Sequence, residues 1–320
     1  MEIRTVALLG AGAIGAYFIP GLSLVLGQNF CVIAEGERAD RLKENGIVVN
    51  GKQYYPQVLS AEEAGAKGID LLLVATKYNG LFDALDDIRT IVQMGIVTGR
   101  DLADPAGTMV VSTLNGIDSE EIIGKVIGPQ RVINGLMKMN SERSGNEVVI
   151  DARGCEGLIF GEQGTSEKTE RCEAIETLLN TAGIKCRFTG DIVTEQWQKF
   201  ELNISNNLPQ AVFGVGFGSY TDSRHMGYLH DCLAYEVVVT AAKHGIKIKF
   251  EQNIRGRARA DARFSTLQDL DAGRETEIEM LAGVLMDKAQ EVDVPVPFTE
   301  YTYHAIKILE EKNAGLFDYE

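Results

Sequence analysis

The chain has 320 residues, of which 45% are hydrophobic and 24% are charged. These are the proportions of a globular protein, and the length favours two domains because single hydrophobic cores stop growing near ~250 to 300 residues. A formal net charge of −15 disfavours a nucleic-acid partner, because the electrostatic field of the protein repels polyanions. An anionic small substrate would need locally placed cations.

Cysteine usage and hydropathy predict a cytoplasmic protein. The five cysteines are scattered and lack CxxC spacing, which predicts reduced thiols and neither a metal site nor a disulfide framework. No apolar run approaches the ~20 residues that span a bilayer, so no membrane partner is expected. No charged leader with a cleavage site precedes the first strand-like run. The cysteines are Cys31, Cys155, Cys172, Cys186 and Cys232.

A glycine-rich motif follows the first apolar run, residues 3–9. The GxGxxG match consists of Gly10, Ala11, Gly12, Ala13, Ile14 and Gly15. Gly10 would permit a tight turn, Gly12 a close approach of backbone to a pyrophosphate, and Gly15 close packing of helix on strand. The N–H groups that open the next helix would face the anion, although Pro20 should kink or shorten that helix. The context favours a dinucleotide-binding turn over an ordinary glycine-rich turn.

Glu35 ends a second expected strand, residues 30–34, twenty residues after the glycine motif. At this place a carboxylate can accept a hydrogen bond from an adenosine ribose 2′-OH and repel a 2′-phosphate, which favours NAD over NADP. Arg38 and Arg41 follow closely, and an arginine there could accommodate the phosphate. NADP therefore stays open.

Two further strands end in polar residues. A strand over 70–75 is followed by Lys77, and one over 108–113 by Asn115. Because ligands of open parallel sheets bind outside the carboxyl ends of the strands, Gly10, Glu35, Lys77 and Asn115 should converge. We expect a hairpin over 47–59 that turns at Asn50–Gly51, and a long polar connection over 94–107 that is either a lid or a surface excursion.

The βα alternation ends near residue 190. Strands are expected over 131–139, 147–150, 158–160 and 185–189, with a helix over 167–182, and 3.6-residue periodicity dominates afterwards. We therefore predict an α/β Rossmann-type dinucleotide-binding domain over 1–191 and an all-helical substrate and dimerisation domain over 192–320.

A polar stripe opens the helical part. Lys199, Asn203 and Asn207 are four residues apart, so on a continuous α-helix they share one face. Asparagine is a poor helix former, and a face that binds the oxygens of a ligand would explain its use here. The alternative is a helix that bonds its asparagines to adjacent loops.

Ser265 and Glu277 form a second polar pair in this part of the chain. They lie twelve residues apart, about 18 Å along a continuous helix. Both can touch one small molecule only if the helix breaks between them, and Ala272–Gly273 is the expected place.

These motifs together resemble the ketopantoate reductase (2-dehydropantoate 2-reductase) family over nearly the whole chain. The resemblance rests on GAGAIG, Lys77, the LNGID stretch at Asn115, the Lys199-x3-Asn203-x3-Asn207 helix and the STLQDLDAGRETEIE segment. It implies a helical second domain like the C-terminal domain of 6-phosphogluconate dehydrogenase. It also implies reduction of 2-dehydropantoate to D-pantoate, a step of pantothenate biosynthesis, with NAD or NADP and no metal. Independently of the resemblance, a helical second domain with an exposed apolar face would favour a homodimer.

The resemblance also assigns roles to residues. Lys199 would be the general acid, and Glu277 would orient the substrate or the lysine. Asn203, Asn207 and Ser265 would hold substrate oxygens, while Lys77 and Asn115 would lie against cofactor and substrate.

The sequence departs from the family pattern at two places. Many members carry an arginine where this chain has Glu35, and Phe217 occupies the region where a further asparagine is expected. These departures keep open a D-2-hydroxyacid dehydrogenase that acts on other branched or aromatic 2-oxo acids. A non-catalytic dinucleotide-binding sensor is a more distant alternative, against which Lys199 and Glu277 argue.

Overall fold

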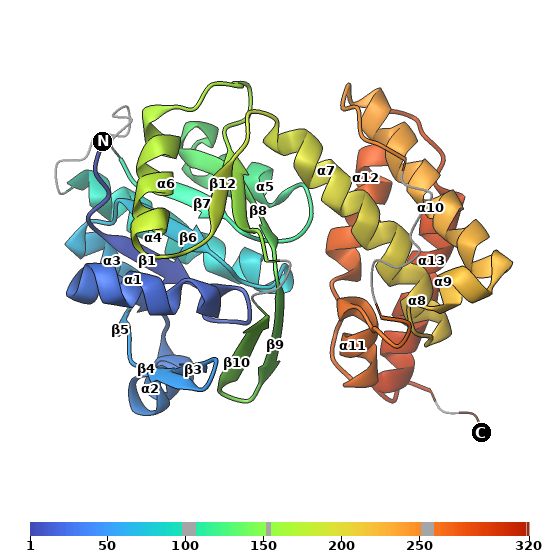
Figure 1. Cartoon of the computed structure of the whole chain (residues 1–320), viewed down its shortest axis with the longest axis horizontal. Coiled ribbons are helices and arrows are strands. Elements are labelled where there is room, and N and C mark those ends of the chain that lie inside the picture. The colour runs from blue at the N-terminus through green and yellow to red at the C-terminus, as the bar shows by residue number, and fades with distance from the viewer. Residues whose placement is uncertain (98–106, 152–154, 251–258, 318, 320) are drawn as a thin grey trace. The chain divides into compact units, whose positions relative to one another are not determined.

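The computed structural model describes residues 1–97, 107–151, 155–250, 259–317 and 319 (Figure 1). The chain falls into two compact units, Met1–Ile192 and Val193–Glu320. Every helix in the described part is too short or too polar to span a bilayer. All five cysteines are free thiols.

An eight-stranded sheet forms the centre of the first unit, in the order β12-β11-β8-β7-β6-β1-β2-β5. Neighbouring strands in this sheet pair in parallel, except β8 and β11, which are antiparallel. The strands are β1 (Val6–Leu9), β2 (Phe30–Ile33), β5 (Gln57–Leu59), β6 (Leu71–Val74), β7 (Met109–Ser112), β8 (Val132–Lys138), β11 (Gly157–Gly161) and β12 (Cys186–Phe188). β1 lies between β2 and β6, so the strand order reverses there, which is where open α/β sheets bind ligands.

Both faces of this sheet are buried, which explains the continuous apolar strands. β1, β2, β6 and β7 are buried at every position. The helices of the unit are η1 (Gly15–Tyr17), α1 (Ile19–Leu26), η2 (Gly27–Asn29), α2 (Gly36–Asn45), α3 (Ala61–Lys67), α4 (Asn79–Val97), α5 (Ser119–Ile127), η3 (Pro129–Arg131) and α6 (Glu170–Thr181). Leu22 of α1 and Ile175 of α6 share one core with Leu8 and Leu73 of the strands. Parallel sheets need such helical cover.

A second, four-stranded sheet has the order β4-β3-β10-β9. It contains β3 (Ile47–Val49), β4 (Lys52–Tyr54), β9 (Asn140–Ser144) and β10 (Glu147–Asp151). The hairpin turn is confirmed, with positive φ at Asn50 (48°) and Gly51 (75°). The expected hairpin over 47–59 is too long, because β5 leaves it and pairs with β2 in the main sheet.

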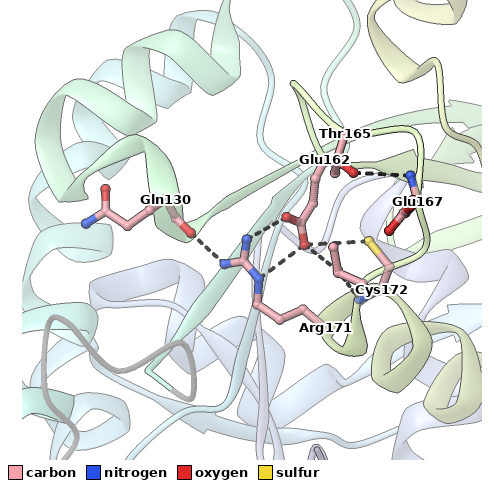
Figure 2. A network of polar contacts seen from close by, with 7 residues as sticks. Gln130, Glu162, Thr165, Glu167, Arg171 and Cys172 are labelled. Carbon is pink, nitrogen blue, oxygen red and sulfur yellow. Dashed lines mark hydrogen bonds and ion pairs between the residues drawn. The ribbon is translucent and has the colours of Figure 1, made fainter.

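An ion-pair network ties the end of β11 to α6 (Figure 2). Arg171 donates to Glu162 from Nη2 at 2.8 Å and from Nε at 3.1 Å. It also donates from Nη1 to the carbonyl of Gln130 at 2.5 Å. Thr169 donates to Glu162 at 2.6 Å and accepts from the N–H of Cys172 at the start of α6. Glu162 therefore joins the end of the strand to the start of the helix, and Arg171 extends the network to the η3 turn.

The second unit is helical throughout its described residues. It contains α7 (Ile192–Leu202), η4 (Asn203–Asn207), α8 (Leu208–Phe213), α9 (Ser219–Asp222), α10 (Arg224–Lys243), α11 (Ser265–Asp271), η5 (Glu279–Gly283), α12 (Val284–Gln290) and α13 (Pro297–Asn313). Glu236 of α10 is buried and accepts from the N–H groups of Phe298 and Thr299, each at 2.8 Å. It thereby satisfies the open N-terminus of α13.

The expected connection over 94–107 is partly helical. α4 continues to Val97, and residues 98–106 lie outside the described part of the chain.

Candidate active site

The glycine turn joins β1 to η1 at the reversal of strand order. Gly10 has φ +103°, and a Cβ there would lie 2.6 Å from the carbonyl carbon of Ala75. A Cβ at Gly15 would lie 1.9 Å from the carbonyl oxygen of Gly10. The packing of the protein itself therefore demands glycine at both positions.

Gly12 is different, because a Cβ there would meet no described atom within 4 Å. Nothing in the described protein requires glycine at this position, whereas a phosphate that approaches the backbone would. The backbone N–H groups of Gly12 and Ala13 also have no acceptor among the described residues. This turn fits the pyrophosphate of a dinucleotide.

The helix after the turn differs from the expectation. Residues 15–17 form the 3₁₀ turn η1, and α1 begins only at Ile19, with Pro20 in its first turn. Pro20 thus starts the α-helix, where its missing N–H is tolerated, instead of kinking it. The donors that face an anion are consequently those of the turn, because the N–H of Ala16 is already bonded to Gly12 at 2.9 Å.

The polar residues of the sheet edge follow adjacent parallel strands. Glu35 is exposed and directly precedes α2, Lys77 is exposed after β6, and Asn115 is half-buried after β7. Since β2, β1, β6 and β7 are neighbours, their carboxyl ends share one edge with the glycine turn. Tyr78 donates to Asp118 at 2.6 Å and so links the loops after β6 and β7.

The sequence analysis missed Thr76 at this edge. Its buried Oγ1 has no hydrogen-bond partner among the described residues, and its N–H lies 2.7 Å from the Cβ position of Gly10. A buried polar atom without a partner needs an explanation, and at this edge of the sheet a bound ligand would supply one. Its place directly after a buried strand is the signal that could have found it.

The Lys199 helix is interrupted by a wider turn. Lys199 lies half-buried in the last turn of α7, and residues 203–207 form the π-helix η4 before α8 begins. The expectation of one continuous α-helix was wrong at this point. A π-turn closes i→i+5 hydrogen bonds, shifts the residues that follow around the axis, and is frequent at functional sites.

The asparagines of this turn behave differently from one another. Asn206 donates to the carbonyl of Leu202 at 2.8 Å and to Ser205 at 3.2 Å. Asn207, buried with 9% exposure, and half-buried Asn203 have amide groups without a hydrogen-bond partner among the described residues. Two amides of the predicted stripe are thus available to a ligand.

Ser265 and Glu277 lie on separate helices, as the spacing argument required. α11 begins at Ser265 and ends at Asp271, and Gly273 takes φ +62° beyond it. Glu277 precedes η5 by two residues. The predicted break at Ala272–Gly273 is confirmed. Both α11 and η5 contact η4, so the second unit gathers the elements that carry the predicted substrate residues.

Glu310 of α13 anchors the segment that carries Glu277. The sequence analysis did not identify Glu310. Its Oε1 accepts from both the N–H and the Oγ1 of Thr276 at 2.7 Å. Lys307 lies 2.9 Å from the other oxygen. The backbone on either side of Glu277 is therefore fixed, because Ile278 donates in turn to Thr276 at 3.2 Å.

Each unit thus carries one candidate binding site. The first unit presents free backbone donors and a gap at Gly12 to a dinucleotide. The second presents a half-buried cation and two amides to an oxygen-rich ligand.

Comparisons with known proteins agree with this division. The family model described as ketopantoate reductase PanE/ApbA matches residues 6–163, and its C-terminal counterpart matches residues 191–310. A 2-dehydropantoate 2-reductase of Mesorhizobium japonicum is 26% identical over 308 residues, which are 91% of this chain and 93% of the relative.

Solved structures show the same fold. The ternary structure of D-mandelate dehydrogenase with NADH and anilino(oxo)acetate has a TM-score of 0.82 at 20% identity and covers 97% of this chain and 99% of that chain. The 2-dehydropantoate 2-reductase of Methylococcus capsulatus has a TM-score of 0.78 at 22% identity, over 97% and 98% of the two chains. The fold is a Rossmann-type α/β domain followed by a helical domain, and the chain belongs to the ketopantoate reductase family.

Proposed function

We propose that this protein is a nicotinamide-dependent 2-oxo acid reductase that converts 2-dehydropantoate to D-pantoate. The observation that carries the proposal is the pair of partnerless amides, Asn203 and Asn207, on the turns that follow the half-buried Lys199. Two amides and a cation can hold the carboxylate, hydroxyl and ketone oxygens of such a substrate.

The first unit would bind the dinucleotide and the second the substrate. Gly10, Ala11, Gly12, Ala13, Ile14 and Gly15 would cradle the pyrophosphate. Lys77 and Asn115 would lie where cofactor and substrate meet, and Glu35 would face the adenosine ribose. A bound reduced nicotinamide supplies the hydride.

Lys199 would act as the general acid. Reduction of a ketone builds negative charge on its oxygen, so a cation placed there both stabilises the transition state and donates the proton. Glu277, held by its anchored neighbours, would orient Lys199 or the substrate, and Ser265 would bind a substrate oxygen.

A second candidate is a D-2-hydroxyacid dehydrogenase for other branched or aromatic 2-oxo acids. Phe217 is buried and its ring lies 5.4 Å from that of Phe264, the residue before Ser265. An apolar cluster next to a predicted substrate residue favours a larger apolar side chain on the substrate. A D-mandelate dehydrogenase solved with NADH and anilino(oxo)acetate has the same fold.

The decisive assay follows the loss of absorbance at 340 nm with NADH and with NADPH, against 2-dehydropantoate and a panel of 2-oxo acids. Turnover of 2-dehydropantoate supports the first candidate. Turnover confined to other 2-oxo acids supports the second. Cofactor binding without turnover on any of them would contradict both and favour a sensor.

We further propose a homodimer formed through the second unit. Tyr228 and Tyr235 on α10 and Tyr301 and Ile308 on α13 are exposed, by 61%, 63%, 67% and 52% respectively. The members of each pair are seven residues apart and share a helix face, and α10 contacts α13. We call these four residues the apolar group of α10 and α13. Exposed apolar residues that gather on one surface mark association sites.

A further inference from the structure

The segment before α11 is held by hydrogen bonds from a distant stretch of the chain. Phe217 donates to the carbonyl of Ala262 at 3.0 Å, and Gly218 donates to the carbonyl of Ala260 at 2.8 Å. The two stretches therefore lie side by side through their backbones. Ser265, the first residue of α11, follows this segment directly.

Two glycines allow this close approach. A Cβ at Gly216 would lie 2.5 Å from the carbonyl oxygen of Ala260, and one at Gly218 would lie 2.9 Å from the Cβ of Ala260. A side chain at either position would push the segment away, because these distances are shorter than a van der Waals contact. The packing around Ala260 therefore fixes the path of the chain that leads to α11.

Gln210 of α8 bonds the same segment with both ends of its side-chain amide. Its Nε2 donates to the carbonyl of Ala262 at 2.9 Å, and its Oε1 accepts from the N–H of Phe264 at 2.6 Å. The side chain is fully buried. A glutamine that offers a donor and an acceptor to the backbone of one segment holds that segment as a neighbouring strand would.

This glutamine is also close in the chain to the asparagines of η4. α8 follows η4 directly, so Gln210 comes three residues after Asn207. The hydroxyl of Tyr220 donates to the carbonyl of Asn206 at 2.5 Å. Burial raises the pKa of Tyr220, and a hydrogen bond with the backbone of Gln210 lowers it. Tyr220 thus stabilises the junction of η4 and α8, from which the side chain of Gln210 extends.

We propose that Gln210 is a positioning residue of the substrate site, which sets the place of Ser265 relative to Asn207. The inference rests on the proposed function, in which these two side chains bind oxygens of one 2-oxo acid. Ser265 is exposed, and its hydroxyl makes no hydrogen bond to another described residue. Its place therefore depends on the backbone of Phe264, which Gln210 fixes.

Loss of this contact should move one substrate group relative to the other. Without the amide of Gln210, the N–H of Phe264 loses its acceptor, while the bonds from Phe217 and Gly218 remain. The end of the segment next to Ser265 is then released and its start stays fixed. A displacement of about 1 Å at a group that positions the substrate can lower the rate by ~10²-fold.

The test is a double-mutant cycle on the full chain, with 2-dehydropantoate, or the 2-oxo acid that the wild type reduces, as substrate. Gln210→Met keeps the side-chain length but removes both polar ends. It should raise KM by about 10-fold and change the Kd of the reduced cofactor by less than ~2-fold. Ser265→Ala should raise KM by a similar factor. Because Gln210 acts through Ser265, the double variant should match Ser265→Ala within ~2-fold.

Two further variants separate position from stability. Thr302→Val removes a buried hydrogen bond of 2.7 Å within α13 and should lower the melting temperature without changing KM. Gln210→Glu keeps the acceptor for Phe264 and, when protonated, the donor for Ala262. Burial favours the protonated acid. Its KM relative to the wild type should therefore fall as the pH is lowered from about 8 to about 5.5, whereas the ratio for Gln210→Met should stay constant.

Three results would overturn the inference and leave reduction of a 2-oxo acid standing. They are a KM of Gln210→Met within ~2-fold of the wild type, a normal KM of Ser265→Ala, and effects of the two substitutions that multiply in the double variant. If Gln210→Met does not fold, the pH series on Gln210→Glu decides, and a constant ratio to the wild type would overturn the inference. A wild type that binds cofactor but reduces none of the 2-oxo acids would overturn the proposed function as well.

Discussion

The asparagine side chains of η4 in the second unit differ in whether they form hydrogen bonds within the described fold. Asn206 is bonded to its own helix, whereas Asn203 and Asn207 have amides without partners in the described chain. Along this one turn, the side-chain amide of Asn206 is hydrogen-bonded within the described fold, whereas the amides of Asn203 and Asn207 are not. Substitutions should separate stability from activity at neighbouring positions.

Lys199→Ala should abolish most turnover without unfolding the protein. Removal of a general acid lowers kcat by about 10²- to 10⁴-fold, or about 3 to 5 kcal/mol. Steady-state kinetics at 340 nm measure the loss, and circular dichroism and cofactor titration should match the wild type. Lys243→Ala, at an exposed position of α10, is the charge-matched control. Turnover close to wild type in Lys199→Ala would contradict the assignment.

Asn207→Leu should raise the KM for the 2-oxo acid by roughly 10-fold or more while the melting temperature stays within a few degrees, because no bond of the described fold is lost. Asn206→Leu should do the opposite. It breaks bonds to Leu202 and Ser205 and should reduce the free energy of unfolding by about 1 to 3 kcal/mol. Thermal denaturation and steady-state kinetics on the two variants test these assignments. A loss of stability in Asn207→Leu but not in Asn206→Leu would contradict them.

Secondary-structure elements in the first unit are joined by charged groups as well as by the core. The clearest case is Glu162, whose side chain is 14% exposed, with Arg171 at 19%. Burial alone would raise the pKa of Glu162, but the bonds from Arg171 and Thr169 and the charge of Arg171 outweigh it and lower the pKa. The ionised carboxylate is thus the form that the fold stabilises.

This network should make the first unit sensitive to acid. A carboxyl group whose pKa is lower in the folded state adds stability above its unfolded pKa and loses it as pH falls through the folded pKa. Glu162→Gln should therefore lower the free energy of unfolding by about 1 to 3 kcal/mol at pH 7, with a smaller effect below pH 4. Urea denaturation at several pH values measures this. Exposed Glu167→Gln is the control, and an equal loss at all pH values would exclude the ionic explanation.

The hydrophobic pattern and local turn residues predicted those elements whose own residues determine the structure. The central strands β1, β2 and β6 were expected because their residues are apolar throughout, and the turn at Asn50–Gly51 because its dipeptide favours positive φ. β9 was missed, since Asn140–Ser144 (NSERS) is polar and pairs at an edge. β5 was misassigned because three residues do not reveal whether they pair locally or with β2.

The candidate site residues were predicted from motifs, whereas their local geometry was not. Motif spacing found Lys199, Asn203 and Asn207, and helix length predicted the break before Glu277. The π-helix η4 was not foreseen, because i→i+5 bonding leaves no mark in hydrophobic spacing. Glu310 was missed because its partner, Thr276, lies 34 residues away in the chain.

On the scale of the whole molecule, a chain with strong negative charge still keeps an apolar surface in its second unit. We expect the apolar group of α10 and α13 to mediate self-association. We expect the protein to be a dimer by light scattering after gel filtration. Tyr235→Glu and Tyr301→Glu should weaken the dimer by about 10- to 100-fold, because a charge would be buried at its centre. Tyr55→Glu, equally exposed at 61% but in the first unit, should not. A monomeric wild type would contradict the proposal.

The small sheet also has a kinetic consequence. It joins segments 100 residues apart, as in the bond between Asn50 and Ile150. Closing so long a loop costs entropy before any contact compensates it, so such pairings form late in folding. During synthesis, β3 and β4 must wait for β10 while the strands of the main sheet from β1 to β7 can already assemble. A newly made chain would thus form its glycine turn early and gain the hydrogen bond from Arg143 to the carbonyl of Ala11 only when the small sheet closes.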